Sequence, residues 1–125
     1  MSLPTGSWEI DANGYVGELE IKSITNGRLT GTVLGNPIDG FWSNSMKRIV
    51  FMRVIDPNDA STLQVFTGYY WRELQPPPIG TSFLAGFFEA FQGSGGTAKR
   101  SVFGWTARKT TLVEMGPPNI GVKPK

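Results

Sequence analysis

The residue types that this chain lacks restrict its chemistry. None of its 125 residues is a histidine or a cysteine. A Ser-His-Asp triad, imidazole acid/base catalysis, thiol nucleophiles and His- or Cys-ligated metal sites are therefore excluded. Carboxylates remain, and Glu18, Glu20 and Glu89 stand in strand-like segments. We expect the first two to be solvated on an outer face and Glu89 to pair with a neighbouring arginine, so no enzyme active site is predicted.

Two polar loops have only a superficial likeness to ligand sites. The run from Gly93 to Lys99 is rich in glycine, but it lacks the Gly-Lys-Ser/Thr ending of a phosphate loop, and a flexible hairpin turn is favoured. Asp56, Asn58 and Asp59 carry oxygen ligands without the spacing of an EF-hand, and Asp-Pro commonly opens a turn. The sequence therefore predicts no metal and no cofactor.

The charge distribution bears on partners. The formal net charge is +2, and lysine and arginine are scattered rather than gathered in a stripe, which argues against nucleic-acid binding. No segment is long and apolar enough to cross a bilayer, and residues 1–4 lack the apolar region of a signal peptide. We expect no membrane partner, and we assign no compartment because a cysteine-free chain works in either redox setting.

Glycines inside apolar runs indicate the architecture that must position any site. Strand-like segments are centred on Gly17, Gly31, Gly40, Gly68, Gly86 and Gly104. Glycine weakens a strand unless strong curvature or the close approach of another segment requires it. Its recurrence in successive strands predicts a sheet coiled tightly enough to close into a small barrel.

Turn signals divide the chain into about eight strands. Asn13-Gly14 and Asn26-Gly27 suit two-residue hairpins, because both positions of such a turn need a positive φ. The strands are expected near residues 6–11, 14–22, 28–35, 37–42, 47–55, 62–72, 82–92 and 100–109. The predicted fold class is all-β: an eight-stranded antiparallel up-and-down barrel over residues 5–109, with a C-terminal tail or linker over residues 110–125.

Side-chain alternation assigns the two faces of these strands. Gly17 and Leu19 alternate with Glu18 and Glu20, so the glycine side is interpreted as the interior. The same rule places these residues inward: Tyr15, Leu29, Val33, Ile38, Trp42, Phe66, Tyr70, Leu84, Phe88, Val102 and Thr106. The strand over residues 47–55 is apolar on both sides, and its inward face stays open.

Aromatic residues gather on the opposite face of the later strands. They are Tyr69, Trp71, Phe87, Phe103 and Trp105. Strict alternation keeps them out of the interior, so they must contact something else. The second layer of a sandwich and the C-terminal tail are alternatives. We favour a subunit interface and expect a homo-oligomer, a dimer or larger.

Short motifs in strand order resemble a known family. Thr5-Gly6-Ser7-Trp8, Leu29-Thr30-Gly31-Thr32 and Phe66-Thr67-Gly68 are similar to segments of avidin and streptavidin, members of the calycin group of up-and-down barrels. The likeness runs over residues 5–109. In calycins this tryptophan lies at the closed end beneath an arginine of the last strand. The resemblance therefore implies structural roles for Trp8 and Arg108.

The resemblance does not extend to the biotin-binding residues. Val33 stands where avidins have a ligand-binding tyrosine, and the lid after the third strand is reduced to residues 35–37. The tryptophan of the family's seventh strand has no equivalent in Phe83-Leu84-Ala85. Each missing hydrogen bond to a buried polar headgroup costs about 1–3 kcal/mol. Tight biotin binding is not expected.

Two functions remain. The first is a non-catalytic barrel that binds a small, mainly apolar ligand in its mouth. The residues expected nearest that ligand are Tyr15, Val33, Ile38, Gln64, Phe66, Phe88, Gln92 and Arg100. The second is an interaction or assembly module, with the interior filled by its own rings and the outer aromatic residues as its working surface. A cavity would distinguish the two.

Overall fold

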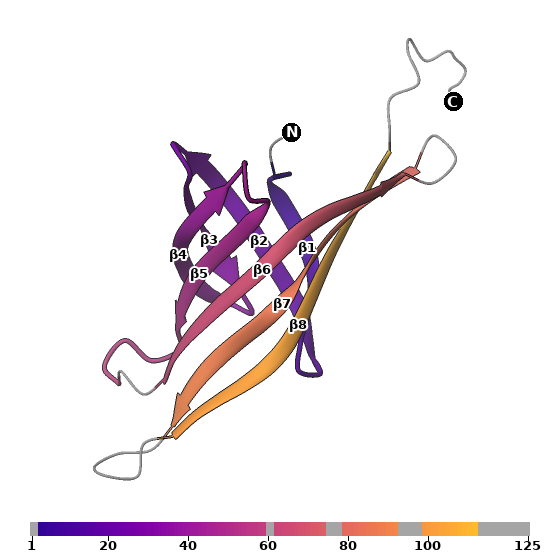
Figure 1. Cartoon of the computed structure of the whole chain (residues 1–125). Helices are drawn as coiled ribbons and strands as arrows, with labels where there is room; N and C mark the ends of the chain where they lie inside the picture. Colours follow the sequence, from indigo (N-terminus) through magenta and orange to yellow (C-terminus); the bar gives the residue numbers. More distant parts are fainter. Residues whose placement is uncertain (1–2, 60–61, 75–78, 93–98, 113–125) are drawn as a thin grey trace, which may run out of the picture.

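The computed structural model describes residues 3–59, 62–74, 79–92 and 99–112 and shows a closed barrel of eight strands (Figure 1). The strands are β1 (Gly6–Ala12), β2 (Tyr15–Thr25), β3 (Arg28–Val33), β4 (Asn36–Ser43), β5 (Arg48–Val54), β6 (Leu63–Leu74), β7 (Ile79–Gln92) and β8 (Lys99–Leu112). Consecutive strands pair antiparallel, and β8 pairs with β1. The predicted up-and-down barrel is confirmed. Within the described residues, no helix is long and apolar enough to span a membrane.

The last three strands are longer than the sequence predicted. β7 and β8 have 14 residues each, and β8 continues to Leu112, beyond the expected end of the barrel at residue 109. Figure 1 shows β6, β7 and β8 running past the shorter strands of the barrel. β1 pairs with β8 only from Glu9 to Ala12, so a short ladder closes the sheet. The predicted loop over residues 93–98 and the tail beyond residue 112 lie outside the described residues.

Both predicted two-residue hairpins are confirmed by their backbone angles. Asn13 and Gly14 have φ of 53° and 91°, and Asn26 and Gly27 have φ of 52° and 82°. Two successive positive φ values give a turn whose twist matches that of the flanking strands. These turns fix the register of β1 with β2 and of β2 with β3.

The mid-strand glycines permit a close approach between neighbouring strands. A Cβ on Gly31 would lie 1.9 Å from the carbonyl oxygen of Glu20, and one on Gly86 would lie 1.9 Å from that of Thr67. No side chain fits at such distances, so the curvature of the barrel requires glycine there. A Cβ on Gly68 would instead lie 2.5 Å from the Trp105 ring.

Aromatic residues pack the closed end of the barrel, where the first strand begins. The Trp8 and Trp42 rings each meet Tyr70 edge-on, with centroid distances of 6.5 and 5.8 Å. The Trp8 Nε1–H donates to the carbonyl oxygen of Pro4 at 3.0 Å. Leu3 is buried with them. The predicted interior position of Trp8 is confirmed.

The predicted face of β8 is wrong by one residue. Trp105 is buried at 2% exposure, whereas Val102 and Thr106, both expected inside, face solvent. Gly104 caused the error, because it was assigned inward with the other mid-strand glycines although it lies on the outer face. Nothing comes closer than 3.9 Å to a Cβ placed on it. A shift of one residue turns every side chain of a strand to the other face.

The inward Trp105 joins three strands. Its indole lies against Gly68, and its Nε1–H is 3.1 Å from the carbonyl oxygens of both Thr67 and Phe87. The prediction that Trp105 belongs to an outer interface is therefore wrong. Phe103, two residues earlier, is partly buried against the core, so its predicted interface position is wrong as well.

Arg108 does not lie across Trp8. It belongs to the outward set of β8, and its Nε–H donates to Glu9 Oε1 at 2.8 Å. Both side chains of this ion pair are more than half exposed. The structural role that the resemblance implied for Arg108 is therefore wrong, for the same reason as the shifted face of β8.

Gly86→Ala and Gly104→Ala form a matched test of the close strand approach. We expect Gly86→Ala to lower the free energy of unfolding by about 1–3 kcal/mol, because its Cβ would push against the β6 backbone. Gly104→Ala should be neutral or stabilising by about 0.5 kcal/mol, since its site is open and alanine restricts the unfolded chain. Urea unfolding measures both. Equal losses in the two variants would contradict this account of the curvature.

Candidate functional site

A hollow of about 720 Å³ occupies the open mouth of the barrel, beside the turn between β1 and β2. This volume lies within the range of small-molecule sites. Its apolar lining residues are Ala12, Val16, Leu34, Ile55, Phe88, Ala90 and Phe103. Its polar lining comes from Asn13, Tyr15, Arg53 and Gln64. The hollow thus combines apolar walls with a substantial share of polar groups.

A row of phenylalanine rings lies beneath the hollow. Strand register places Phe51, Phe66, Phe88 and Phe103 side by side on β5 to β8. The first three rings stack, with 4.7 Å between successive centroids, and Phe103 follows at 5.3 Å from Phe88. Phe51 and Phe66 are fully buried, whereas Phe88 and Phe103 reach the hollow. The ring row separates the mouth from the packed interior.

A polar row stands one step nearer to solvent. On each strand the member of this row is two residues from the phenylalanine of the ring row. Arg53 of β5 pairs in register with Gln64 of β6, and Gln64 pairs with Ala90 of β7. The Arg53 Nη1–H donates to Gln64 Oε1 at 3.0 Å. Its Nε–H and Nη2–H both donate to Asn36 Oδ1, at 2.9 and 2.7 Å. Two neutral amides thus hold the guanidinium at the rim.

Among the described residues that line this hollow, Arg53 is the one that carries a charge. It is partly buried, and burial lowers the pKa of its guanidinium below the ordinary value. The described arginine–carboxylate ion pairs join Arg28 to Asp39, Arg100 to Glu89 and Arg108 to Glu9, and none includes Arg53. The mouth therefore carries a positive charge that no described carboxylate neutralises.

A strained turn between β3 and β4 supports the rim of the hollow. Leu34 has a φ of 49°, which is uncommon for leucine, and Gly35 follows with a φ of 87°. The Leu34 N–H donates to the Glu18 carbonyl oxygen at 2.9 Å. The leucine side chain lies over Gly17, where an added Cβ would come within 2.5 Å of Leu34 Cδ2. The absence of a side chain at Gly17 thus gives Leu34 its place on the wall.

Three of the predicted ligand residues line the hollow, namely Tyr15, Gln64 and Phe88. Tyr15 differs from the expectation because it is 72% exposed and lies at the rim rather than inside. Three others, Val33, Ile38 and Phe66, are buried in the core and do not line the hollow. The side chain of Gln92 lies outside the described residues.

Arg100 is not in the hollow either. It faces solvent and forms an ion pair with Glu89 on the neighbouring strand β7. The expectation that Glu89 pairs with an arginine is confirmed. Asp56, Asn58 and Asp59 form a turn, as expected, in which the Asn58 N–H donates to Asp56 Oδ1 at 3.0 Å. Within the described residues, no group of three or more acidic side chains could hold a metal ion.

Arg53 is the functional candidate that sequence reasoning missed. It stands in the strand whose inward face could not be assigned, because Ile49 and Phe51 on one side are matched by Val50 and Met52 on the other. The structure places Ile49, Phe51 and Arg53 inward. The one sequence feature that could have identified Arg53 was its charge, because it is a charged residue on one of two otherwise apolar faces of this strand.

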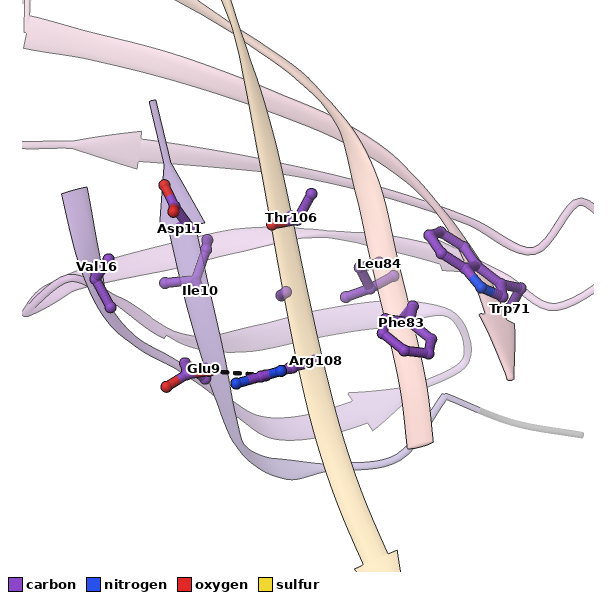
Figure 2. A pocket seen from close by; sticks show the side chains of 10 residues that line it. Glu9, Ile10, Asp11, Val16, Trp71, Phe83, Leu84, Thr106 and Arg108 are labelled. Carbon is purple, nitrogen blue, oxygen red and sulfur yellow. Dashed lines mark hydrogen bonds and ion pairs between the residues drawn. The ribbon is translucent and has the colours of Figure 1, made fainter. Parts of the chain in front are cut away.

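A second, shallower hollow of about 560 Å³ runs along the outer wall. Figure 2 shows Glu9 and Arg108 joined across β1 and β8, with Phe83 and Trp71 on the adjoining strands. The Trp71 and Phe83 rings stack at 5.1 Å, and Trp71 remains 43% exposed. This groove belongs to the outer aromatic surface rather than to the mouth.

The fold and these hollows define an antiparallel barrel with a packed interior and an open, mainly apolar mouth. Comparison of the chain with protein-family models, with curated proteins and with solved structures found no match. The chemistry of the mouth therefore rests on its own geometry.

Arg53→Met tests whether the lone cation opposes folding. We expect it to raise the free energy of unfolding by about 1 kcal/mol, because a partly desolvated guanidinium without a carboxylate partner is unfavourable. Arg72→Met removes the same charge from an exposed position and should change stability by less than about 0.5 kcal/mol. Urea unfolding compares the two. A less stable Arg53→Met would show that the bonds to Asn36 and Gln64 outweigh desolvation.

Proposed function

We propose that this protein is a non-catalytic binding barrel that holds a small, mainly apolar molecule in its mouth. The observation that carries the proposal is the mouth hollow itself, about 720 Å³ in volume, in which apolar walls surround a few convergent polar groups. Such a combination is typical of small-molecule sites. Phe88 and Phe103 of the ring row, which line the hollow, offer contact area, and the polar row offers orientation.

The absence of catalysis in this proposal follows from where the acidic groups lie. Glu9 and Glu89 are held in ion pairs on the outer wall. Asp11 Oδ1 accepts from the Gly14 N–H at 2.8 Å and closes the first hairpin. None of these carboxylates lines the mouth. A bound molecule would therefore meet no carboxylate general acid or base among the described lining residues.

We also propose distant kinship with the avidin-like barrels of the calycin group. Support comes from the shared motifs in strand order, the closed eight-stranded topology and the packing of Trp8 at the closed end. The outward Arg108 departs from the calycin pattern. Val33, which stands in place of the family's tyrosine, is fully buried and has no side-chain hydrogen-bond donor. Weak or absent biotin binding therefore stays our prediction.

A neutral environment-sensitive dye such as Nile red tests the proposed site. We expect dye binding that Ala90→Trp weakens at least tenfold, because a large ring at that lining position would fill the hollow. Ala85→Trp is the matched control, since it adds the same ring to the outer face of the same strand. Fluorescence titration measures both, with circular dichroism as the check on folding. Equal binding to folded Ala90→Trp and wild-type protein would overturn the mouth as the site.

A second candidate function, self-association, is favoured by the remaining outer aromatic residues. Tyr69, Trp71 and Phe87 are 49%, 43% and 43% exposed. Tyr69 and Trp71 lie on β6 and Phe87 lies on β7, and Trp71 lines the groove of Figure 2. Each such ring, once buried, contributes about 1.5–3 kcal/mol. We propose that this face meets a second copy of the chain.

The double variant Trp71→Glu with Phe87→Glu tests that interface. We expect a folded monomer, because two carboxylates would have to be desolvated at the centre of the contact. Multi-angle light scattering at micromolar concentration gives the mass of both forms, and the wild-type protein should be a dimer or larger. A wild-type monomer at high micromolar concentration would remove the self-association proposal and leave the mouth proposal untouched.

A further inference from the structure

We propose that the mouth selects amphipathic anions: molecules with an apolar body and one carboxylate or comparable oxyanion, which Arg53 binds. This inference rests on the proposed function and names its ligand class. It adds to the apolar pocket a residue that would recognise the charge of the ligand, namely Arg53 held by Asn36 and Gln64. Without Arg53, no positive charge would remain among the described lining residues to attract an anion.

The composition of the lining supports an anionic ligand. Arg53 is the one charged residue of the described lining, and its described partners, Asn36 and Gln64, are neutral amides. None of the described ion pairs joins Arg53 to an acidic side chain. Elsewhere on the barrel, Arg28, Arg100 and Arg108 each have a carboxylate. An arginine held by amides alone keeps its full charge for a ligand.

The Arg53 guanidinium also has N–H donors that its described hydrogen bonds do not use. The three described bonds use the Nε–H, one N–H of Nη1 and one N–H of Nη2. One further N–H on each of Nη1 and Nη2 has no partner among the described residues. Asn36 and Gln64 fix the plane of the guanidinium by bonding different sides of it. The group is thus oriented in advance, which reduces the loss of side-chain entropy when an anion binds.

The charge of Arg53 lies next to the phenylalanine rings that line the hollow. Gln64 and Ala90 lie in register with Arg53, and Phe66 and Phe88 lie in the row below. A ligand with its oxyanion on Arg53 can therefore rest its body against Phe88 and Phe103, which are exposed to the hollow. Partial burial, which also lowers the Arg53 pKa, weakens the competition of water for the ion pair.

Octanoate and octanamide provide a matched pair of probes, because they share a chain and differ in charge at one end. Both are titrated at pH 8 and low salt against protein preloaded with Nile red, and displacement gives the two affinities. We expect octanoate to bind at least tenfold more tightly than octanamide. Added salt should reduce the preference, since the site is open to solvent on one side.

Arg53→Gln should bring the affinities of the two probes to within about twofold of each other, each corrected for the Nile red affinity of that variant. Arg72→Gln removes the same charge at an exposed position and should keep the wild-type preference. If Arg53→Gln does not fold, the Nε–H resonance of Arg53 in the wild-type protein supplies the second measurement. It should shift with octanoate and not with octanamide.

The outcomes separate this inference from the proposed function. Equal affinity of octanoate and octanamide for the wild-type protein, with Nile red bound in the mouth, overturns the anion preference and leaves the binding barrel standing. A preference for octanoate that Arg53→Gln retains also overturns it, because another cation must then act. If neither probe nor Nile red binds, both the proposed function and the inference fail.

Discussion

The barrel depends on the close approach of neighbouring strands at mid-strand glycines. At Gly31, Gly40 and Gly86, a single added carbon would lie within about 2 Å of a carbonyl oxygen on the adjacent strand. A sheet can coil this tightly only where no side chain stands between the two backbones. The short ladder between β1 and β8 can then form and close the sheet, with β8 paired to β1 from Trp105 to Arg108.

Tight curvature also determines what the interior holds. A narrow barrel is filled by the side chains of its own strands, and here the ring row and the inward Trp105 occupy its middle. The Trp105 N–H finds carbonyl oxygens of two neighbouring strands, so its indole is both packed and hydrogen-bonded. A hollow is left at the mouth, beyond the ring row.

The mouth contains two features that are usually unfavourable for folding, namely a strained backbone and a partly buried charge. Leu34 adopts a left-handed backbone conformation, and Arg53 is partly desolvated beside amides rather than a carboxylate. Strain and uncompensated charge persist where the surrounding structure over-determines them, and they concentrate at functional sites. Exposed ion pairs lie on the outer wall and apolar rings inside. The mouth is not alone in these features, because Lys47 also has a positive φ of 53° and the buried Trp42 Nε1–H has no hydrogen-bond partner among the described residues.

The sequence by itself determined the strands, the first two hairpins and the closed architecture, because Asn-Gly turns, alternation and mid-strand glycines act over a few residues. It also placed Trp8, Phe66 and Phe88 inside correctly. Only the tertiary structure decided the face of β8, since Gly104 has no close neighbour while Gly68 leaves room for Trp105. Only the structure brought Arg53 to Asn36 and Gln64, because β5 is apolar on both sides and its orientation is set by register with β4 and β6.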